Sequence, residues 1–204
     1  RTRGTPACPF FFEAMKSPKS VAGGASADCA YDAGCRDCPR LAGFLDRVRR
    51  DHPGYFCLPV PPFGVDAPKL VIVGLAPGLH GANRTGRPFT GDYAGILLYE
   101  TLHRFGFASK PVSVGADDGL RLKECRITNA VKCLPPQNKP ETAEIRACNR
   151  YLRAELVALP ADIAILALGT IAHAAVLAAL GLRAAQCRFA HGAVHALPSG
   201  QTLF

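Results

Sequence analysis

Residues 70–95, LVIVGLAPGLHGANRTGRPFTGDYAG, constrain the fold more than any other stretch of the chain. The first five residues form an apolar run rich in β-branched side chains, which predicts a strand buried in a parallel sheet. The segment that follows is rich in glycine and polar side chains, so it predicts a long loop. Ligands of open α/β sheets bind beyond the carboxyl ends of the strands, and we therefore expect the functional site in this loop.

The remainder of the chain alternates apolar strands with amphipathic helices. Further strands are predicted at 125–131 and 162–168, and the start of a fourth follows a hairpin near the end. Helices are predicted for 96–105, 140–160 and 171–180. This order predicts an α/β fold, a three-layer sandwich around a central, mostly parallel four-stranded sheet. We expect residues 1–28 to form a poorly ordered tail and 29–204 to form a single domain.

The composition narrows the class of protein. The net charge of +8 favours a polyanionic partner such as DNA, although a basic chain alone is weak evidence for one. No apolar run is long enough to predict a membrane helix, and the first residues do not resemble a signal peptide. Nine cysteines without a secretory signal favour metal binding or buried thiols, and hence a reducing cytoplasm.

Four of the cysteines have the spacing of a metal site. Cys35 and Cys38 stand three apart before a predicted helix, whereas Cys133 and Cys148 are separated by 14 residues. A single C-x-x-C is equally compatible with a redox pair or a structural role. Four thiolates bind either zinc or an iron–sulfur cluster, and the spacing does not choose between them. Cys57, Cys125 and Cys187 are expected to be buried, inert thiols.

The central loop resembles the first motif of the family 5 (B-type) uracil-DNA glycosylases, in the segments 74–78, GLAPG, and 83–92, NRTGRPFTGD. The resemblance extends over about residues 33–204. It implies an enzyme that flips a deaminated base out of DNA and hydrolyses its N-glycosidic bond, acting on uracil and on hypoxanthine or xanthine. It also implies a four-iron, four-sulfur cluster on the four spaced cysteines. We expect a monomer in a bacterial-type cytoplasm, associated with the nucleoid.

The same resemblance assigns roles to residues of the two loops. Asp92 is the expected catalytic carboxylate, which stabilises positive charge on the sugar or holds the attacking water. Phe89 would stack on the flipped base, while Asn129 and Asn138 would read its edge. Leu75 stands where family 4 enzymes are expected to carry a glutamate. The remaining expected substrate-binding residues are Gly74, Ala76, Pro77, Gly78, His80, Asn83 and Arg84.

Some alternatives stay open. Asp92 is also well placed to be merely the N-cap of the helix that follows. Arg84, Arg87, Lys132 and Lys139 are the expected phosphate contacts. The family's His-containing second motif would follow Phe204 and is absent from this sequence, so we expect the domain to be truncated at its C-terminus. The competing functions are an iron–sulfur module that binds DNA without cleaving it, and a zinc-containing nucleotide-binding domain.

Overall fold

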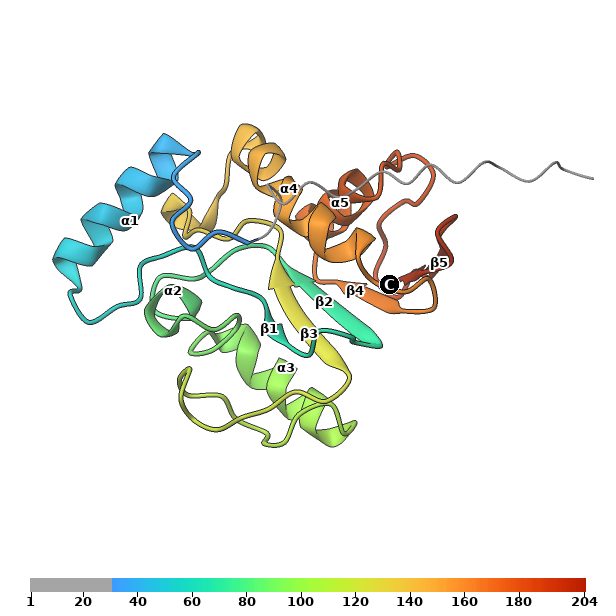
Figure 1. Ribbon diagram of the computed structural model, residues 1–204, viewed down its shortest axis with the longest axis horizontal. Coiled ribbons are helices and arrows are strands. Elements are labelled where there is room, and N and C mark those ends of the chain that lie inside the picture. Colours follow the sequence, from blue (N-terminus) through green and yellow to red (C-terminus); the bar gives the residue numbers. More distant parts are fainter. Residues whose placement is uncertain (1–30) are drawn as a thin grey trace, which may run out of the picture.

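A computed structural model describes residues 31–204, and the predicted 1–28 tail lies outside them. Figure 1 shows a twisted sheet with helices on both of its faces. The sheet has six strands in the order β1-β3-β2-β4-β6-β5. The strands are β1 (Phe63–Gly64), β2 (Leu70–Gly74), β3 (Cys125–Asn129), β4 (Ala164–Ala167), β5 (His195–Ala196) and β6 (Thr202–Leu203).

The four strands β3, β2, β4 and β6 pair in parallel, which confirms the predicted α/β class and its parallel centre. The two outer strands, β1 and β5, pair antiparallel; β1 was not predicted, and β5 lies in the segment near the end where a hairpin was expected. Each has only two residues, too few for an alternating apolar pattern to appear in the sequence. The four-stranded prediction was therefore right for the parallel centre and two strands short for the whole sheet.

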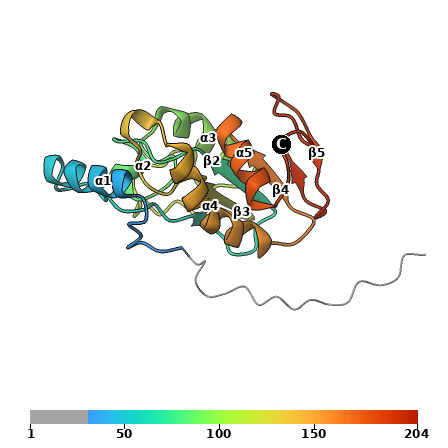
Figure 2. The ribbon, with the colours of Figure 1, turned by 90° about the horizontal axis from the view of Figure 1, so that it is seen from above.

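The layers follow from the alternation of side chains along β2. Val71 and Val73 pack against the helices α4 (Thr142–Val157) and α5 (Thr170–Ala179). Ile72 lies on the opposite face with Tyr99 and Leu102 of α3 (Tyr93–Arg104). Figure 1 shows the sheet between these two layers, and Figure 2 shows α4 and α5 lying across the strands. The helices are α1 (Pro39–Asp51), α2 (Ala82–Thr85), α3 (Tyr93–Arg104), α4 (Thr142–Val157) and α5 (Thr170–Ala179), with a short 3₁₀ turn, η2 (Pro136–Asn138).

Several predicted boundaries move by a few residues. Helix α3 begins at Tyr93, three residues before the predicted start. Strand β3 ends at Asn129, which places this asparagine at the carboxyl edge of the sheet. Helix α4 begins after Glu141, whose side chain forms a capping box with Glu144, so Pro140 is not its first residue. No helix within residues 31–204 is long and apolar enough to cross a membrane.

Candidate active site

A cavity of about 650 Å³ opens beyond the carboxyl ends of the central strands. Its wall combines residues just after β2, the last residue of β3 and Leu168 after β4 with one side of α3. The predicted site residues that line it are Leu75, Ala76, Gly78, Phe89, Asp92, Asn129 and Asn138. Segments up to 93 residues apart in the sequence (Leu75 to Leu168) thus meet at the place where an open α/β sheet binds ligands.

Asp92 occupies the N-cap position of α3, but its carboxylate makes no hydrogen bond to the amides at the start of that helix. It turns instead toward the loop after β2, where its Oδ2 lies 3.4 Å from the amide nitrogen of Ala82. A Cβ at Gly81 would lie 1.8 Å from Oδ1, and one at Gly78 would lie 2.3 Å from the same atom. The two glycines therefore make the space that the carboxylate fills, and a capping role does not explain its orientation.

The electrostatics of Asp92 are balanced between burial and two favourable contacts. Burial raises the pKa of this carboxyl above its ordinary value, because the charged form loses water. The amide of Ala82 and the positive charge of Arg84 act in the opposite direction and lower the pKa. The Asp92 carboxylate is therefore held at the cavity wall by the Ala82 amide and by the nearby charge of Arg84.

Phe89 and Asn129 lie side by side against Gly74. A Cβ at Gly74 would come within 2.4 Å of Asn129 Oδ1 and 2.6 Å of Phe89 Cζ, so glycine is needed there. The backbone of Phe89 has a φ of +59°, which is unusual for a residue with a side chain. Its carbonyl oxygen lies so close to Gly95 that a Cβ there would be only 1.7 Å away. The chain thus tolerates local strain to present this ring to the cavity.

Asn129 brings an unsatisfied polar atom to the cavity wall. Its side chain is 3% exposed, and Oδ1 has no hydrogen-bond partner among residues 31–204. A buried amide oxygen without a partner costs free energy, and a ligand that donates a hydrogen bond would recover it. The structure therefore offers a hydrogen-bonding group where the ligand would lie.

Five predicted substrate-binding residues do not line this cavity. Gly74, Pro77 and Asn83 are buried, and the side-chain amide nitrogen of Asn83 lies 3.5 Å from Cys57 Sγ. His80 and Arg84 are exposed, and His80 Nδ1 pairs with the hydroxyl of Tyr55 at 2.8 Å. These residues shape the loop from behind or from its outer side.

Two of the four predicted phosphate contacts are wrong. Arg87 is 4% exposed, pairs with Asp118 at 2.8 Å and lies 4.4 Å above the ring of Phe63. Lys132 is 1% exposed and its Nζ lies 2.6 Å from Glu155. Buried side chains that are already paired cannot meet a phosphate without breaking these contacts. The sequence shows a positive charge in a loop but not its buried partner 23 or 31 residues away.

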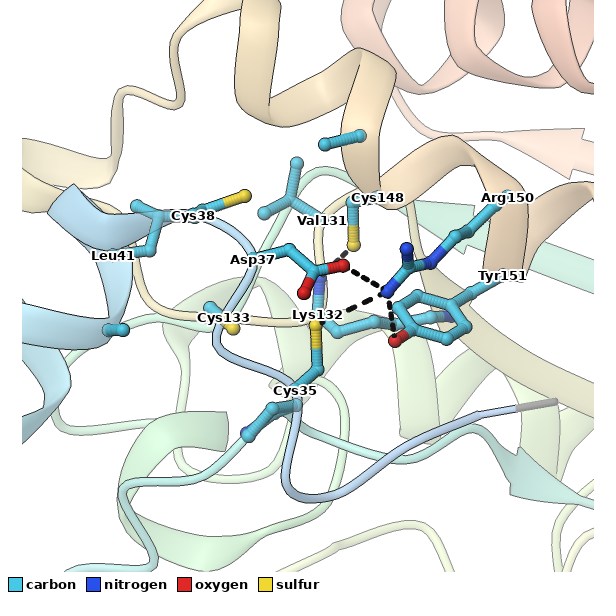
Figure 3. A pocket seen from close by; sticks show the side chains of 13 residues that line it. Cys35, Asp37, Cys38, Leu41, Val131, Lys132, Cys133, Cys148, Arg150 and Tyr151 are labelled. Carbon is cyan, nitrogen blue, oxygen red and sulfur yellow. Dashed lines mark hydrogen bonds and ion pairs between the residues drawn. The ribbon is translucent and has the colours of Figure 1, made fainter. Parts of the chain in front are cut away.

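The spaced cysteines Cys35, Cys38, Cys133 and Cys148 converge on a separate pocket between α1, α4 and the loop after β3 (Figure 3). The space left between them is small, about 20 Å³. Among residues 31–204, this pocket and the cavity at Asp92 share no lining residue. The remaining described cysteines behave as predicted, since Cys57, Cys125 and Cys187 are buried in the core.

The four thiols interact but do not surround a single point. Burial, and then the nearby thiols of Cys148, Cys35 and Cys38, raise the pKa of Cys133 to about 12. Positive and donating groups are also close, because the amide of Lys132 donates to Cys148 Sγ at 3.2 Å. Figure 3 shows the guanidinium of Arg150 between Asp37 and Cys35. Within residues 31–204, no three His, Cys, Asp or Glu side chains are grouped so that they could hold a single metal ion.

The sequence did not point to one wall of the main cavity. Besides Ala94, helix α3 contributes Tyr93, Leu97, Leu98 and Thr101. Tyr93, Leu97 and Thr101 recur every four residues, which places them on one face of the helix. This spacing could have identified them, but apolar residues at helical spacing are ordinarily read as core.

Comparison with known proteins gives a consistent result along the chain. Residues 61–203 match the Uracil DNA glycosylase superfamily. The Type-5 uracil-DNA glycosylase of Thermus thermophilus is 48% identical over 174 residues, which cover 83% of this chain and 79% of that protein. The Type-5 uracil-DNA glycosylase of Mycobacterium bovis is 46% identical over 195 residues, 90% of this chain and 72% of that protein.

The similarity extends to a second branch of the superfamily but covers less of the chain. The Type-4 uracil-DNA glycosylase of Thermotoga maritima is 37% identical over 105 residues, 51% of this chain and 46% of that protein. Identity and coverage are both higher for the type-5 proteins, as the GLAPG and NRTGRPFTGD segments predict. On these grounds the chain belongs to the type-5 uracil-DNA glycosylases of the Uracil DNA glycosylase superfamily.

Proposed function

We propose that this enzyme binds DNA, takes a uracil base into the cavity beside Asp92 and hydrolyses its N-glycosidic bond. The observation that carries the proposal is the placement of the Asp92 carboxylate, which two glycines admit to the wall of a cavity large enough for a nucleobase. Cleavage of this bond builds positive charge on the sugar. A fixed carboxylate lowers the barrier by stabilising that charge or by holding the water that attacks.

The other residues of the cavity suit a planar base with hydrogen-bonding edges. The ring of Phe89 offers a stacking surface, and the unsatisfied oxygen of Asn129 accepts a hydrogen bond from an N–H of the base. Asn138, from the turn η2, completes the polar part of the wall. Among the lining residues from the described chain, Asp92 is the sole carboxylate, and Leu75 contributes an apolar side chain.

The decisive assay measures free uracil released from an oligonucleotide that contains one deoxyuridine, under single-turnover conditions. Asp92→Asn should release uracil at least about 10²-fold more slowly than the wild type while it binds DNA as well. Equal rates would remove Asp92 from the mechanism. Binding without any release by the wild type would favour the second candidate, a module that recognises DNA without cleaving it.

We extend the proposal to deaminated purines. The cavity volume of about 650 Å³ leaves room for the two rings of hypoxanthine or xanthine as well as for uracil. Oligonucleotides that differ only in the target base, uracil, hypoxanthine or xanthine, measure the range directly. Release of uracil alone would show that the polar groups of the wall, and not its volume, set the specificity.

We also propose that Cys35, Cys38, Cys133 and Cys148 hold a four-iron, four-sulfur cluster. The donor set fits, since the four thiols face one pocket and a backbone amide donates to Cys148 Sγ. Their arrangement around a volume, not one point, is what a cluster requires, because each thiolate bonds a different iron. When bound, the cluster would cross-link α1, α4 and the loop after β3.

Metal analysis of protein purified without oxygen tests this assignment. We expect about four irons per chain, and substitution of Cys133 by Ser should lower both the iron content and the folded fraction. Cys57→Ser is the matched control, because Cys57 is buried but lies outside the pocket. One zinc per chain and no iron would overturn the proposal. The expected monomer and cytoplasmic location remain predictions, the first of which gel filtration can test.

A further inference from the structure

Large apolar side chains stand exposed around the mouth of the cavity. At the start of α3, Tyr93 is 91% exposed, Ile96 63% and Leu97 70%. Across from them, Val112 in the loop after α3 is 59% exposed. Single exposed apolar residues need no explanation, but a group of them at the rim of a cavity marks a binding surface.

A second cavity of about 350 Å³ lies on the other side of Tyr93. It is lined by Ile96 and by Pro111, Val112 and Ser113 of the loop after α3. The two cavities share three residues, Phe89, Asp92 and Tyr93. Tyr93 therefore forms part of the partition between the site of the expected chemistry and a second apolar depression.

The loop that forms the far wall of this second cavity is held in place. The hydroxyls of Ser113 and Thr90 are 2.7 Å apart, and Arg87 donates to Ser113 Oγ at 2.9 Å. Asp118, the partner of Arg87, also accepts the amide of Val114 at 2.9 Å. Because these bonds anchor the loop to the buried side chains of Arg87 and Thr90, the second cavity is preformed and a ligand would not have to organise the loop.

We infer that the second cavity binds the nucleobase that flanks the target base in the same strand, with the ring of Tyr93 stacked on it. The inference rests on the proposed function, because a strand whose nucleotide enters the first cavity must continue across the residues that both cavities share. An apolar floor with one exposed ring recognises the face of any base without reading its sequence. By stacking on the flanking base, Tyr93 would keep the strand in place while the target base lies outside the base stack.

The contact between Tyr93 and the flanking base can be tested by removing each partner in turn and measuring DNA affinity, independently of base release. Dissociation constants are measured for single-stranded oligonucleotides with one deoxyuridine, in which the 5′ or the 3′ neighbour is either a normal nucleotide or an abasic spacer. Tyr93→Ala should weaken binding of the intact strand about 5- to 150-fold, the range of one base–aromatic stack. On the strand that lacks the flanking base this loss should disappear, because the wild type has already lost the stack.

Two control variants isolate the ring. Tyr93→Phe should bind like the wild type, and Phe105→Ala, which removes a 69% exposed ring at the other end of α3, should change nothing. An equal loss on intact and abasic strands, or no loss at all, would overturn the inference. So would a concentration-dependent dimer that Tyr93→Ala abolishes, since the patch would then join two copies. A wild type that binds by this pattern but releases no uracil would refute the proposed function alone.

Discussion

The sharpest prediction concerns Gly81, which does not line the cavity but leaves room for the carboxylate of Asp92. In Gly81→Ala the new Cβ would lie 2.0 Å from Asp92 Cγ, whereas ordinary contacts begin at 3.4 Å. The carboxylate must therefore retreat by about 1.4 Å (3.4 minus 2.0). A displacement of about 1 Å can cost on the order of 10²-fold in rate, so we expect a loss of that size in single-turnover uracil release.

The loss of uracil-release rate should differ among glycine-to-alanine variants according to how far each new Cβ displaces the carboxylate. A Cβ at Gly78 would lie 2.3 Å from Oδ1 but 3.1 Å from Cγ, so Gly78→Ala displaces less of the carboxylate and should lose less activity. Gly43→Ala is the matched control, because nothing lies within 4 Å of a Cβ in that position. Its rate should equal that of the wild type.

A double mutant separates displacement of the carboxylate from general damage. If Gly81→Ala acts through Asp92, it should cost little further activity in the Asp92→Asn background, because residues that act as a unit are not additive. Circular dichroism and the melting temperature confirm that each variant is folded. The reasoning would be refuted if Gly81→Ala kept full activity, or if its loss were as large in the Asp92→Asn background as alone.

Three further predictions follow from charge and burial. Because burial raises the pKa of Asp92, the folded state disfavours its charged form, and Asp92→Asn should be more stable than the wild type at pH 7. This difference in the free energy of unfolding, measured with urea, should disappear as the pH falls through the raised pKa and the wild-type carboxyl becomes protonated. Burial opposes ionisation of Asp118, but hydrogen bonds from Arg87 and backbone amides hold its pKa well below the usual range. The contribution of ionised Asp118 to the stability of the fold should be complete above about pH 4 and lost as the pH falls below it. Arg87→Met should lower the free energy of unfolding by about 3–5 kcal/mol at pH 7, and equal stability of variant and wild type would contradict the buried pair. For DNA binding, Arg84→Ala and Lys139→Ala should each flatten the slope of log affinity against log salt by about one unit or less, and unchanged slopes would exclude these phosphate contacts.

Much of the fold and part of the site can be predicted from the sequence, for identifiable physical reasons. The strand Leu70–Gly74 appears with its predicted bounds because it is buried on both faces and therefore apolar throughout. Asp92, Phe89 and Asn129 were assigned to one site by the motif resemblance, and they meet at the cavity because the parallel strands β2 and β3 end at the same edge of the sheet. The motif resemblance supplied their proposed chemistry, which spacing alone does not contain.

The remaining features depend on long-range pairing. Arg87 and Lys132 look like surface charges until Asp118 and Glu155 are placed beside them. The direction of the Asp92 side chain was equally hidden, because an aspartate before a helix ordinarily caps it. The close approach of Gly78 and Gly81 and the contact with the Ala82 amide show that the carboxylate turns the other way.

The arrangement of the sheet also determines when the chain can complete its fold during synthesis. Strand β4 lies near the centre of the sheet, yet its outer neighbour β6 comes more than 30 residues later (Ala167 to Thr202). The amides of Thr202 and Phe204 donate to the carbonyls of Ile163 and Ile165 at 3.0 and 2.8 Å, and the amide of Ala167 donates to the carbonyl of Phe204 at 3.0 Å. A nascent chain that has emerged only through α5 therefore displays an unpaired, apolar strand edge, the kind that pairs with other chains. This edge is covered only after residues 202–204 have been synthesised and can pair with β4.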